Sequence, residues 1–214
     1  MKVILLTVLV CTPVGWMWNW FHYYYGVSPA WGFPADQVLG FKICGIPIED
    51  WVFYPITGAF FVTMYIVDPF KRFFKNKESS VWLKTVFFML LLYLIYWGWL
   101  VFGESGTVTA GCFGVPSVYL FMRIFKDWDV WHFIRVLIIV VPTNLFWDIW
   151  ATPGQWFYLT DVGVFSEHFW YFNIPAEMTP YLGIMAGYFV FGVTANINNL
   201  MKGKYGISSK FSNE

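Results

Sequence analysis

Charged residues are scarce in this sequence. Asp, Glu, Lys and Arg account for 12% of its 214 residues, about half of their share in soluble domains. Hydrophobic residues make up 58%, and the mean hydropathy is +0.57. Such a composition excludes an ordinary soluble domain and offers no basic surface for nucleic acid. We therefore expect a single membrane domain over residues 1–214 and no nucleic-acid partner.

Patterns that hold a metal or a disulfide framework are missing as well. The chain has an odd number of cysteines, three, and no pair has Cys-x-x-Cys spacing, so neither a disulfide framework nor a zinc site is expected. The cysteines are Cys11, Cys44 and Cys112. The three histidines have no ligand spacing either, and we expect neither a metal nor another cofactor.

Processing signals are absent from the first segment. It begins Met-Lys and continues with an apolar run, but no small-residue cleavage site follows it. The residue before Cys11 is Val10, which does not suit a lipid-attachment site. We therefore expect residues 3–25 to form an uncleaved helix.

Further apolar runs of about 20 residues, the length that a bilayer requires, follow along the chain. The six expected spans cover residues 3–25, 46–67, 81–103, 108–125, 130–151 and 174–197. The predicted fold class is thus an all-α polytopic membrane protein with six to seven transmembrane helices. Two aromatic loops, 26–45 and 153–173, would lie on one side of the membrane.

Lysine and arginine are distributed unequally between the two ends of these spans. Twelve of the 13 basic residues fall at one set of ends, and Lys42 lies at the other. Because positively charged loops stay on the cytoplasmic side of a membrane, both termini should be cytoplasmic and both aromatic loops non-cytoplasmic. The expected location is the cell (inner) membrane.

An Ile-Pro-x-Glu sequence opens two of the spans and indicates a degenerate internal repeat. When Glu49 is aligned with Glu177, the match continues along one helical face. The matched pairs are Phe53 with Tyr181, Ile56 with Ile184, and Phe60 with Tyr188. The predicted units, about 1–67 and 130–198, are joined by connecting helices over 81–125 and followed by a tail at 199–214. They run in the same direction, whereas an inverted repeat would favour a transporter.

The two glutamates are unusual because a carboxyl group in an apolar helix costs about 2.5–3.5 kcal/mol on insertion scales. Desolvation can keep such a group protonated at neutral pH, which makes it a proton donor. Beside aromatic faces it would be suited to protonate an alkene and to shield the carbocation. Glu49 and Glu177 are the predicted donor and acceptor, with Asp148 and Asp50 as supporting acids. Asp50 should not share the inward direction of Glu49, because adjacent helical residues face different ways.

Each acid also has a structural interpretation. Proline in the first turn followed by glutamate is an ordinary helix start, because the acid complements the helix dipole. Asp148 could cap the end of its helix, and Asp127 and Asp129 are expected on a solvated turn. The aromatic residues beyond each glutamate could pack in the core and not line a groove. Both interpretations stay open at the level of sequence.

Two blocks of the chain carry short motifs in a duplicated order. The first block, roughly 19–66, contains Trp31-Gly-Phe33, Leu39-Gly40-Phe41 and Gly45-Ile-Pro-Ile-Glu-Asp-Trp-Val-Phe53. The second, roughly 144–198, contains Trp147-Asp148-Ile-Trp-Ala151, Trp156-Phe-Tyr158 and Ile174-Pro-Ala-Glu177. These motifs resemble the lycopene cyclase domain family, small membrane cyclases that occur as heterodimers or as fused tandem domains. Residue 178 is Met where the family pattern has a second acid.

The resemblance implies an isomerase of carotenoid biosynthesis. It would close the open ψ-ends of lycopene, or of a related apolar polyene in the bilayer, into β-rings without net redox change. The residues expected to contact that substrate are Phe53, Phe60, Tyr181, Tyr188, Trp31 and Trp156.

Two other functions remain to be weighed against a cyclase. One is a non-enzymatic membrane carrier, transporter or binding protein for an apolar or terpenoid ligand. The other is a relative of the cyclases that hydrates or isomerises its polyene. Prenyl transfer is disfavoured, because the Asp-rich motifs that bind magnesium and diphosphate are absent. A homo-oligomer is left open.

Overall fold

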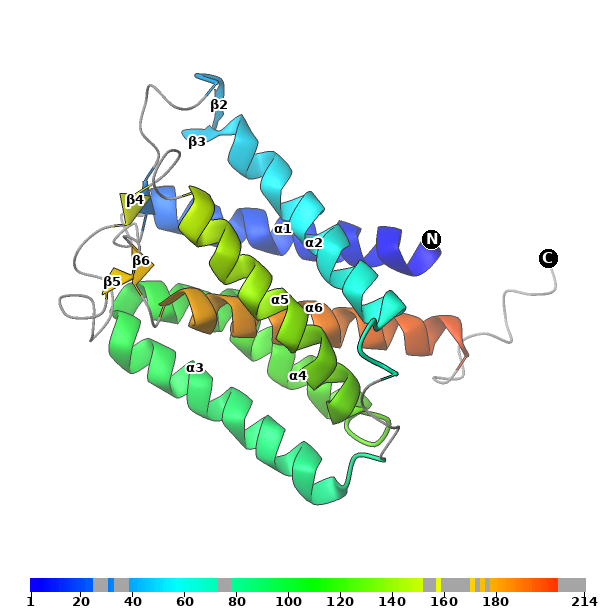
Figure 1. The fold of residues 1–214 in the computed structure, drawn as a ribbon. Coiled ribbons are helices and arrows are strands. Elements are labelled where there is room, and N and C mark those ends of the chain that lie inside the picture. Colours follow the sequence, from blue (N-terminus) through cyan, green and yellow to red (C-terminus); the bar gives the residue numbers. More distant parts are fainter. Residues whose placement is uncertain are drawn as a thin grey trace.

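The computed structural model describes the backbone of residues 1–24, 31–32, 39–72, 78–151, 157–158, 170–171, 174–175 and 178–203, and the side chains of residues 1–22, 39–72, 78–146 and 180–203. Most of this described chain is helical (Figure 1). The α-helices are α1 (Lys2–Tyr24), α2 (Ile48–Val67), α3 (Val81–Thr109), α4 (Val115–Ile124), α5 (Val130–Ala151) and α6 (Met178–Met201). A π-helical turn, η1 (Ala110–Gly114), joins α3 to α4.

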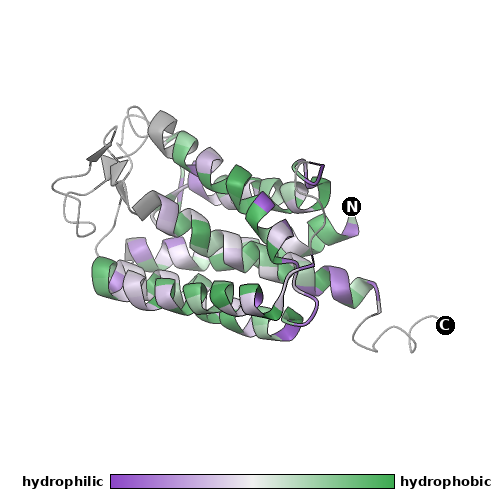
Figure 2. Cartoon of the chain, turned by 60° about the horizontal axis from the view of Figure 1, so that its bottom comes forward, coloured by the Kyte–Doolittle hydropathy of each residue, from purple (hydrophilic) through white to green (hydrophobic). Residues whose placement is uncertain are grey.

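Among the described residues, four helical segments are long and apolar enough to cross a membrane. They are Lys2–His22, Ile48–Val67, Val81–Ile124 and Pro180–Met201. α5 adds a shorter apolar helix, described over Val130–Phe146. Figure 2 shows apolar residues along most of each helix. These are the features of a helical membrane protein.

The 44-residue segment Val81–Ile124 is not one straight rod. Gly103 has φ 53° and ψ −120°, a backbone conformation that residues with a side chain rarely adopt, and the chain reverses there. The rings of Phe88 and Phe125 lie 6.2 Å apart, whereas a straight helix would separate them by about 55 Å. The predicted third and fourth spans therefore lie side by side. The chain reverses at Gly103, and residues 104–107, which lie between the two predicted spans, are helical.

A close contact holds the two arms of this reversal together. A Cβ atom built on Gly106 would lie 1.9 Å from the carbonyl oxygen of Gly98. A Cβ atom on Gly98 would lie 2.0 Å from the hydroxyl oxygen of Tyr181 on α6. Small residues of this kind let helices in membranes approach closely, so the glycines determine how α3 packs.

α6 is the central helix of the bundle. It contacts α1, α2 and α5 as well as α3, η1 and α4, and most of its residues are buried, whereas less than half of each other candidate span is buried. Its contacts with α4 and α5 enclose an aromatic core. That core contains Phe121, Trp128, Phe133, Tyr188 and Phe191.

Short strands lie at the end of the bundle opposite the N-terminus (Figure 1). A hairpin of β2 (Lys42–Ile43) and β3 (Ile46–Pro47) precedes α2, and a hairpin of β5 (Trp170–Tyr171) and β6 (Ile174–Pro175) precedes α6. β1 (Trp31–Gly32) pairs with β4 (Phe157–Tyr158), so the two loops meet. Each strand of the second hairpin follows its counterpart by 128 residues. The same offset separates Glu177 from Glu49, and the order of elements is the same in both halves.

Two predicted helix starts are too early. Ile46 and Pro47 pair in β3, so α2 begins at Ile48, and Ile174 and Pro175 pair in β6, so α6 begins at Met178. The reason is that a residue before proline avoids the helical region and is held extended. α6 also extends to Met201, past the predicted end at residue 197, whereas α5 has the predicted bounds.

The first residue of α1 and the last residue of α6 lie at the same end of the bundle (Figure 1). Lys71 and Arg72 follow α2 at that end, and Lys126 lies in the turn between α4 and α5. Lys42 lies in β2, at the opposite end. Among the described residues, Lys42 is therefore separated from these other basic residues as the sequence predicts, while the side of the membrane that each end faces stays a prediction.

Candidate active site

A cavity of about 130 Å³ lies where α1, α2, η1, α5 and α6 meet. Its walls are mostly apolar and aromatic. The lining residues are Cys11, Gly15, Trp18, Asp50, Phe53, Tyr54, Thr57, Gly58, Phe61, Phe113, Asn144, Leu182, Gly183, Ala186, Phe189 and Val190. A largely apolar cavity with a few polar groups is the usual form of a small-molecule site, so we take it as the candidate site.

Helical periodicity explains which residues reach this cavity. On α2, Asp50, Phe53, Thr57 and Phe61 recur at intervals of three or four residues, so they share one face. On α1, Gly15 permits a close crossing, because a Cβ atom there would lie 2.2 Å from the ring of Tyr54. The α1–α2 pair therefore closes one side of the cavity, and α6 closes the other.

Asp50 is the acid of this cavity. Its side chain is buried in the first turn of α2, and its Oδ2 atom accepts a hydrogen bond from Nδ2 of Asn19 on α1. Asn19 is itself buried, and its Oδ1 atom has no hydrogen-bond partner within the described part of the chain. One side-chain amide thus holds the carboxyl group in position and keeps a free acceptor beside it.

Glu49 is not among the residues that line this cavity, and its catalytic role stays a prediction. Its carboxylate accepts a hydrogen bond from the backbone N–H of Leu39, which fastens the preceding loop to the start of α2. The sequence motif therefore identifies a helix turn that reaches the cavity, but the residue of that turn that faces the cavity is Asp50. Adjacent residues on a helix point about 100° apart, so the inward position of Asp50 turns Glu49 toward the loop.

The remaining predicted site residues divide into two groups. Phe53 lines the cavity. Tyr181 packs against Trp97 and Phe102 with ring centroids 5.7 and 5.0 Å away, and Tyr188 donates a hydrogen bond of 2.9 Å to the carbonyl of Phe87 on α3. Both tyrosines therefore face the α3 side of α6, and Phe60, whose ring packs on that of Phe61, is not among the lining residues either.

Four further predictions fall outside the side chains that the structure describes. They concern Glu177, Asp148, Trp31 and Trp156. The predicted approach of Glu49 to Glu177 stays a prediction for the same reason. The backbone pairing of β1 with β4 does place residues 31–32 beside residues 157–158.

Three residues of α1, Trp18, Asn19 and His22, form hydrogen bonds to neighbouring helices. They were not predicted as a group from the sequence. His22 lies with Nδ1 2.8 Å from the carbonyl oxygen of Trp18 and Nε2 2.9 Å from the hydroxyl of Ser105. Because a carbonyl can only accept, Nδ1 carries the proton and Nε2 accepts from Ser105 in the neutral ring. Trp18 donates from Nε1 to Thr109 at 3.0 Å. With Asn19, these side chains bind α1 to both α2 and α3, and their spacing on one helical face was the available signal.

The chain matches no protein-family model, no curated protein and no solved structure. Its function is therefore argued from the cavity and the residues around it. The carboxyl group of Asp50 within aromatic walls is the chemically distinctive feature of that cavity. Such a group can donate a proton to an apolar ligand, or it can hold a polar group of that ligand.

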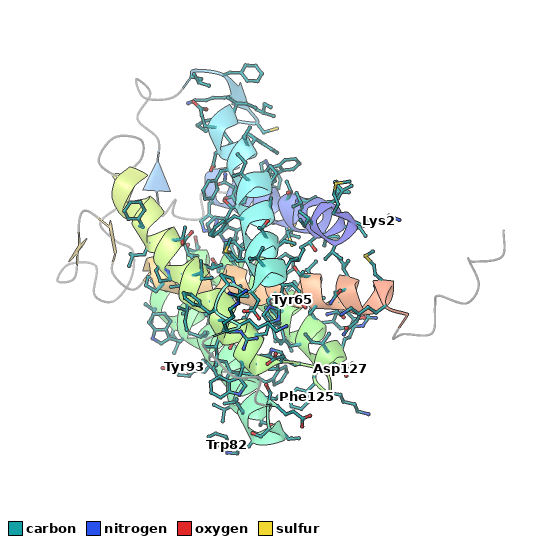
Figure 3. The ribbon with its side chains drawn as sticks, turned by 45° about the vertical axis from the view of Figure 1, so that its right-hand side comes forward. Lys2, Tyr65, Trp82, Tyr93, Phe125 and Asp127 are labelled. Carbon is teal, nitrogen blue, oxygen red and sulfur yellow. The ribbon has the colours of Figure 1, made fainter. Side chains whose placement is uncertain are left out.

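A second polar cluster lies at the basic end of the bundle and contains no cavity-lining residue. Arg135 on α5 forms a bidentate pair with Asp68, which follows α2, with N–O distances of 2.8 Å from Nε to Oδ1 and from Nη2 to Oδ2. His132 donates from Nε2 to the carbonyl of Tyr65 at 2.8 Å, and Tyr65 lies at this end of α2 (Figure 3). The cluster joins α2 to α5 and is structural.

Asp129, expected on a solvated turn, also has a structural role in this cluster. Its Oδ1 atom accepts from the backbone N–H of His132 at 3.1 Å, which caps the first turn of α5, and from the hydroxyl of Ser79 at 3.3 Å. Its carboxylate is half-exposed. An aspartate before a helix and three residues from the N–H that it accepts is a common N-cap, so this role was readable from the sequence.

Proposed function

We propose that the protein is a membrane enzyme of the carotenoid cyclase type, which protonates one end of an apolar polyene and closes that end into a ring. The observation that carries the proposal is a buried carboxyl group, Asp50, at the wall of an aromatic cavity. The resemblance of the sequence motifs to the lycopene cyclase domain family supports the same chemistry. Asp50 takes the donor role that the sequence analysis gave to Glu49.

Asn19 makes Asp50 suited to hold a transferable proton. Its amide nitrogen contacts Oδ2, so a proton on the carboxyl group would be carried by Oδ1. Side-chain amides can also turn, and the buried Oδ1 of Asn19, which has no other partner, would then accept from a protonated carboxyl. Asn19 is therefore a positioning residue that serves both protonation states of Asp50.

The proposed reaction is an isomerisation in which atoms and electrons balance. The O–H bond of Asp50 breaks, and its proton adds to the terminal double bond of the polyene, whose electron pair forms the new C–H bond. The resulting carbocation is attacked by an internal double bond, and a carbon–carbon bond closes the ring. The ring cation then loses a proton to a carboxylate and regains a double bond. Glu177 and Asp148 remain the candidates for this acceptor.

The aromatic walls support the cationic stage. Trp18, Phe53, Phe61, Phe113 and Phe189 line the cavity. Their ring faces carry negative charge density and attract a cation, by roughly 2 kcal/mol or more when water is absent. Apolar walls also keep water away from the carbocation, which would otherwise be captured as an alcohol.

The size of the cavity limits what enters it. An enclosed apolar cavity of about 150 Å³ accepts a ligand of the size of benzene, and this cavity has about 130 Å³. Only one end of a long polyene fits within it. The rest of the chain would lie along the helices in the bilayer, which agrees with a substrate that is dissolved in the membrane.

We further propose six membrane crossings with both termini cytoplasmic in the cell (inner) membrane. The reversal at Gly103 supports counting Val81–Ile124 as two crossings, since it brings Phe88 beside Phe125. The location of the basic residues at the end that holds the start of α1 supports the orientation. The hairpin before α2 and the hairpin before α6, at matching offsets, support a parallel repeat.

Expression in a bacterial host that accumulates lycopene tests the proposed function. The host should form monocyclic or bicyclic carotenes with the wild-type chain, and Asp50→Asn should abolish them at equal levels of folded protein. Unchanged lycopene with folded wild-type protein would contradict the proposal for that substrate. Recovery of bound but unconverted polyene with the purified protein would instead indicate a carrier, the alternative from the other class.

A further inference from the structure

One polar group of the cavity has no role in the reaction proposed above. Asn144 lines the cavity from α5, and no hydrogen bond to its side-chain amide occurs among the described residues. Beside it lies Gly183 of α6, where a Cβ atom would be 3.6 Å from Nδ2 of Asn144. The absence of a side chain at that position leaves space against the amide.

Three other polar side chains of the cavity wall form hydrogen bonds. Thr57 donates to the carbonyl of Phe53 at 2.8 Å, and Trp18 donates to Thr109 at 3.0 Å. Asp50 accepts from Asn19. The side-chain amide of Asn144 can both donate and accept hydrogen bonds, and it has neither kind of partner among the residues that the structure describes.

We propose that Asn144 makes the cavity prefer a polyene whose entering end carries one oxygen, a hydroxyl or a carbonyl, so that a plain hydrocarbon end such as that of lycopene still enters and reacts but binds less tightly. This inference rests on the proposed function in that it concerns the same cavity, and it specifies the substrate class. A hydrocarbon end would displace water from the amide and leave it unpaired, whereas an oxygen restores its hydrogen bond. A site built to bond a substrate hydroxyl rejects the analogue without it more strongly than a site that distinguishes methyl groups.

Two ring-sized probes of the same shape test this inference. 4-Fluorophenol and 4-fluorotoluene differ by a hydroxyl in place of a methyl group, and both approach the size that the cavity accepts. Their binding to the full-length chain in detergent is measured by fluorine NMR, with empty micelles as the reference for partitioning. We expect the wild-type chain to bind the phenol about tenfold more tightly or better.

The variants assign that preference to Asn144. Asn144→Leu should lose the preference, because phenol affinity falls while toluene affinity is kept or rises. Thr143→Val, one residue earlier on the exposed side of α5, should keep it. Equal affinities in the wild-type chain, or a preference that survives in Asn144→Leu, would overturn the inference. If the leucine variant does not fold, Asn144→Ala is measured in its place and carries the same two outcomes.

This binding experiment is independent of turnover. A chain that prefers the phenol through Asn144 but converts no polyene in the host would retain the inference and lose the proposed function. A chain that converts lycopene but binds both probes equally would lose the inference alone. Asp50→Asn separates the proposed function from this inference once more. It should abolish product formation, while the preference for the phenol that depends on Asn144 should remain.

Discussion

At the scale of single residues, the structure separates two neighbouring acids, of which Glu49 was the predicted proton donor or acceptor and Asp50 a supporting acid. Glu49 and Asp50 begin the same helix, and their side chains point in different directions. The contact of Glu49 with Leu39 turns it toward the loop, and the contact of Asp50 with Asn19 turns it inward. Both contacts come from other segments of the chain, so a motif read along one helix cannot supply them.

The first prediction compares these two acids. Glu49→Gln keeps an oxygen that accepts from Leu39, so product formation should remain close to that of the wild-type chain. Asp50→Asn removes the transferable proton and should lower turnover by about 10²- to 10⁴-fold, the usual loss for a general acid. Product per unit of folded protein is the measurement, with the exposed Glu104→Gln as a control. An equal loss of turnover in Glu49→Gln and Asp50→Asn would contradict this assignment, because both acids would then take part in donating the proton.

The second prediction concerns the buried ion pair of Asp68 and Arg135. Asp68→Asn leaves the guanidinium of Arg135, 2% exposed, without its main partner. Removing one partner of a buried pair costs about 3–5 kcal/mol. The free energy of unfolding, measured by titration with sodium dodecyl sulfate, should fall accordingly. The double variant Asp68→Asn/Arg135→Met should be more stable than Asp68→Asn alone, because asparagine tolerates the left-handed conformation at residue 68 (φ 43°) in both variants. Equal instability of both would argue against the buried charge as the cause.

At the scale of elements, composition and apolar run length predicted helices at nearly all positions where the structure has them. α5 has its predicted bounds, and α1 begins and ends within one residue of its prediction. The errors occur at Ile46-Pro47 and Ile174-Pro175, where strand pairing across a tight hairpin competes with helix formation. A further difference follows Gly103. Residues 104–107 lie between two predicted spans, but in the structure they are helical.

Six residues were predicted to contact a substrate, and the structure describes the side chains of four of them. Phe53 lines the cavity, whereas Tyr181, Tyr188 and Phe60 do not, and contact with a substrate stays a prediction. The repeat assumed that matched positions on α2 and α6 face the same centre. α6 is surrounded on all sides, while α2 exposes much of its surface, so equivalent positions have different neighbours. How deeply a helix is buried depends on all the helices around it, so the periodicity of apolar residues within one helix does not predict it.

The third prediction tests the close crossing that folds α3 back. Gly106→Ala places a Cβ atom against the carbonyl of Gly98, so the two arms must separate and stability should fall by roughly 1–3 kcal/mol. Gly111 is the matched control, since a Cβ atom there meets nothing within 4 Å. Gly111→Ala should be neutral or slightly stabilising because alanine favours the helix. Equal effects of both substitutions on the detergent unfolding midpoint would contradict a specific contact at Gly106.

At the scale of the whole molecule, surface exposure follows the expectation for a protein surrounded by lipid. The outer side of α3 presents Trp82 and Tyr93, which are 72% and 58% exposed (Figure 3). The buried polar clusters lie toward the two ends of the bundle, with Asp50 and His22 near the strands and Asp68 and Arg135 near the basic turns. Between them the helices are apolar over most of their length (Figure 2). The remaining question at this scale is which end faces the cytoplasm.

The fourth prediction answers that question with a cysteine that the chain already has. Cys44 is exposed in the turn between β2 and β3, whereas Cys11 and Cys112 are buried. If the strand end is non-cytoplasmic, as the positions of lysine and arginine predict, a membrane-impermeant maleimide should label intact spheroplasts at Cys44. Cys44→Ser should abolish that labelling. Lys202→Cys, added to Cys44→Ser at the end of α6, should react only after the membrane is permeabilised.

The reverse pattern, with Cys44 protected and Lys202→Cys reactive in intact spheroplasts, would invert the topology. The candidate cavity, whose residue Asp50 lies near the strand end, would then lie closer to the cytoplasmic leaflet.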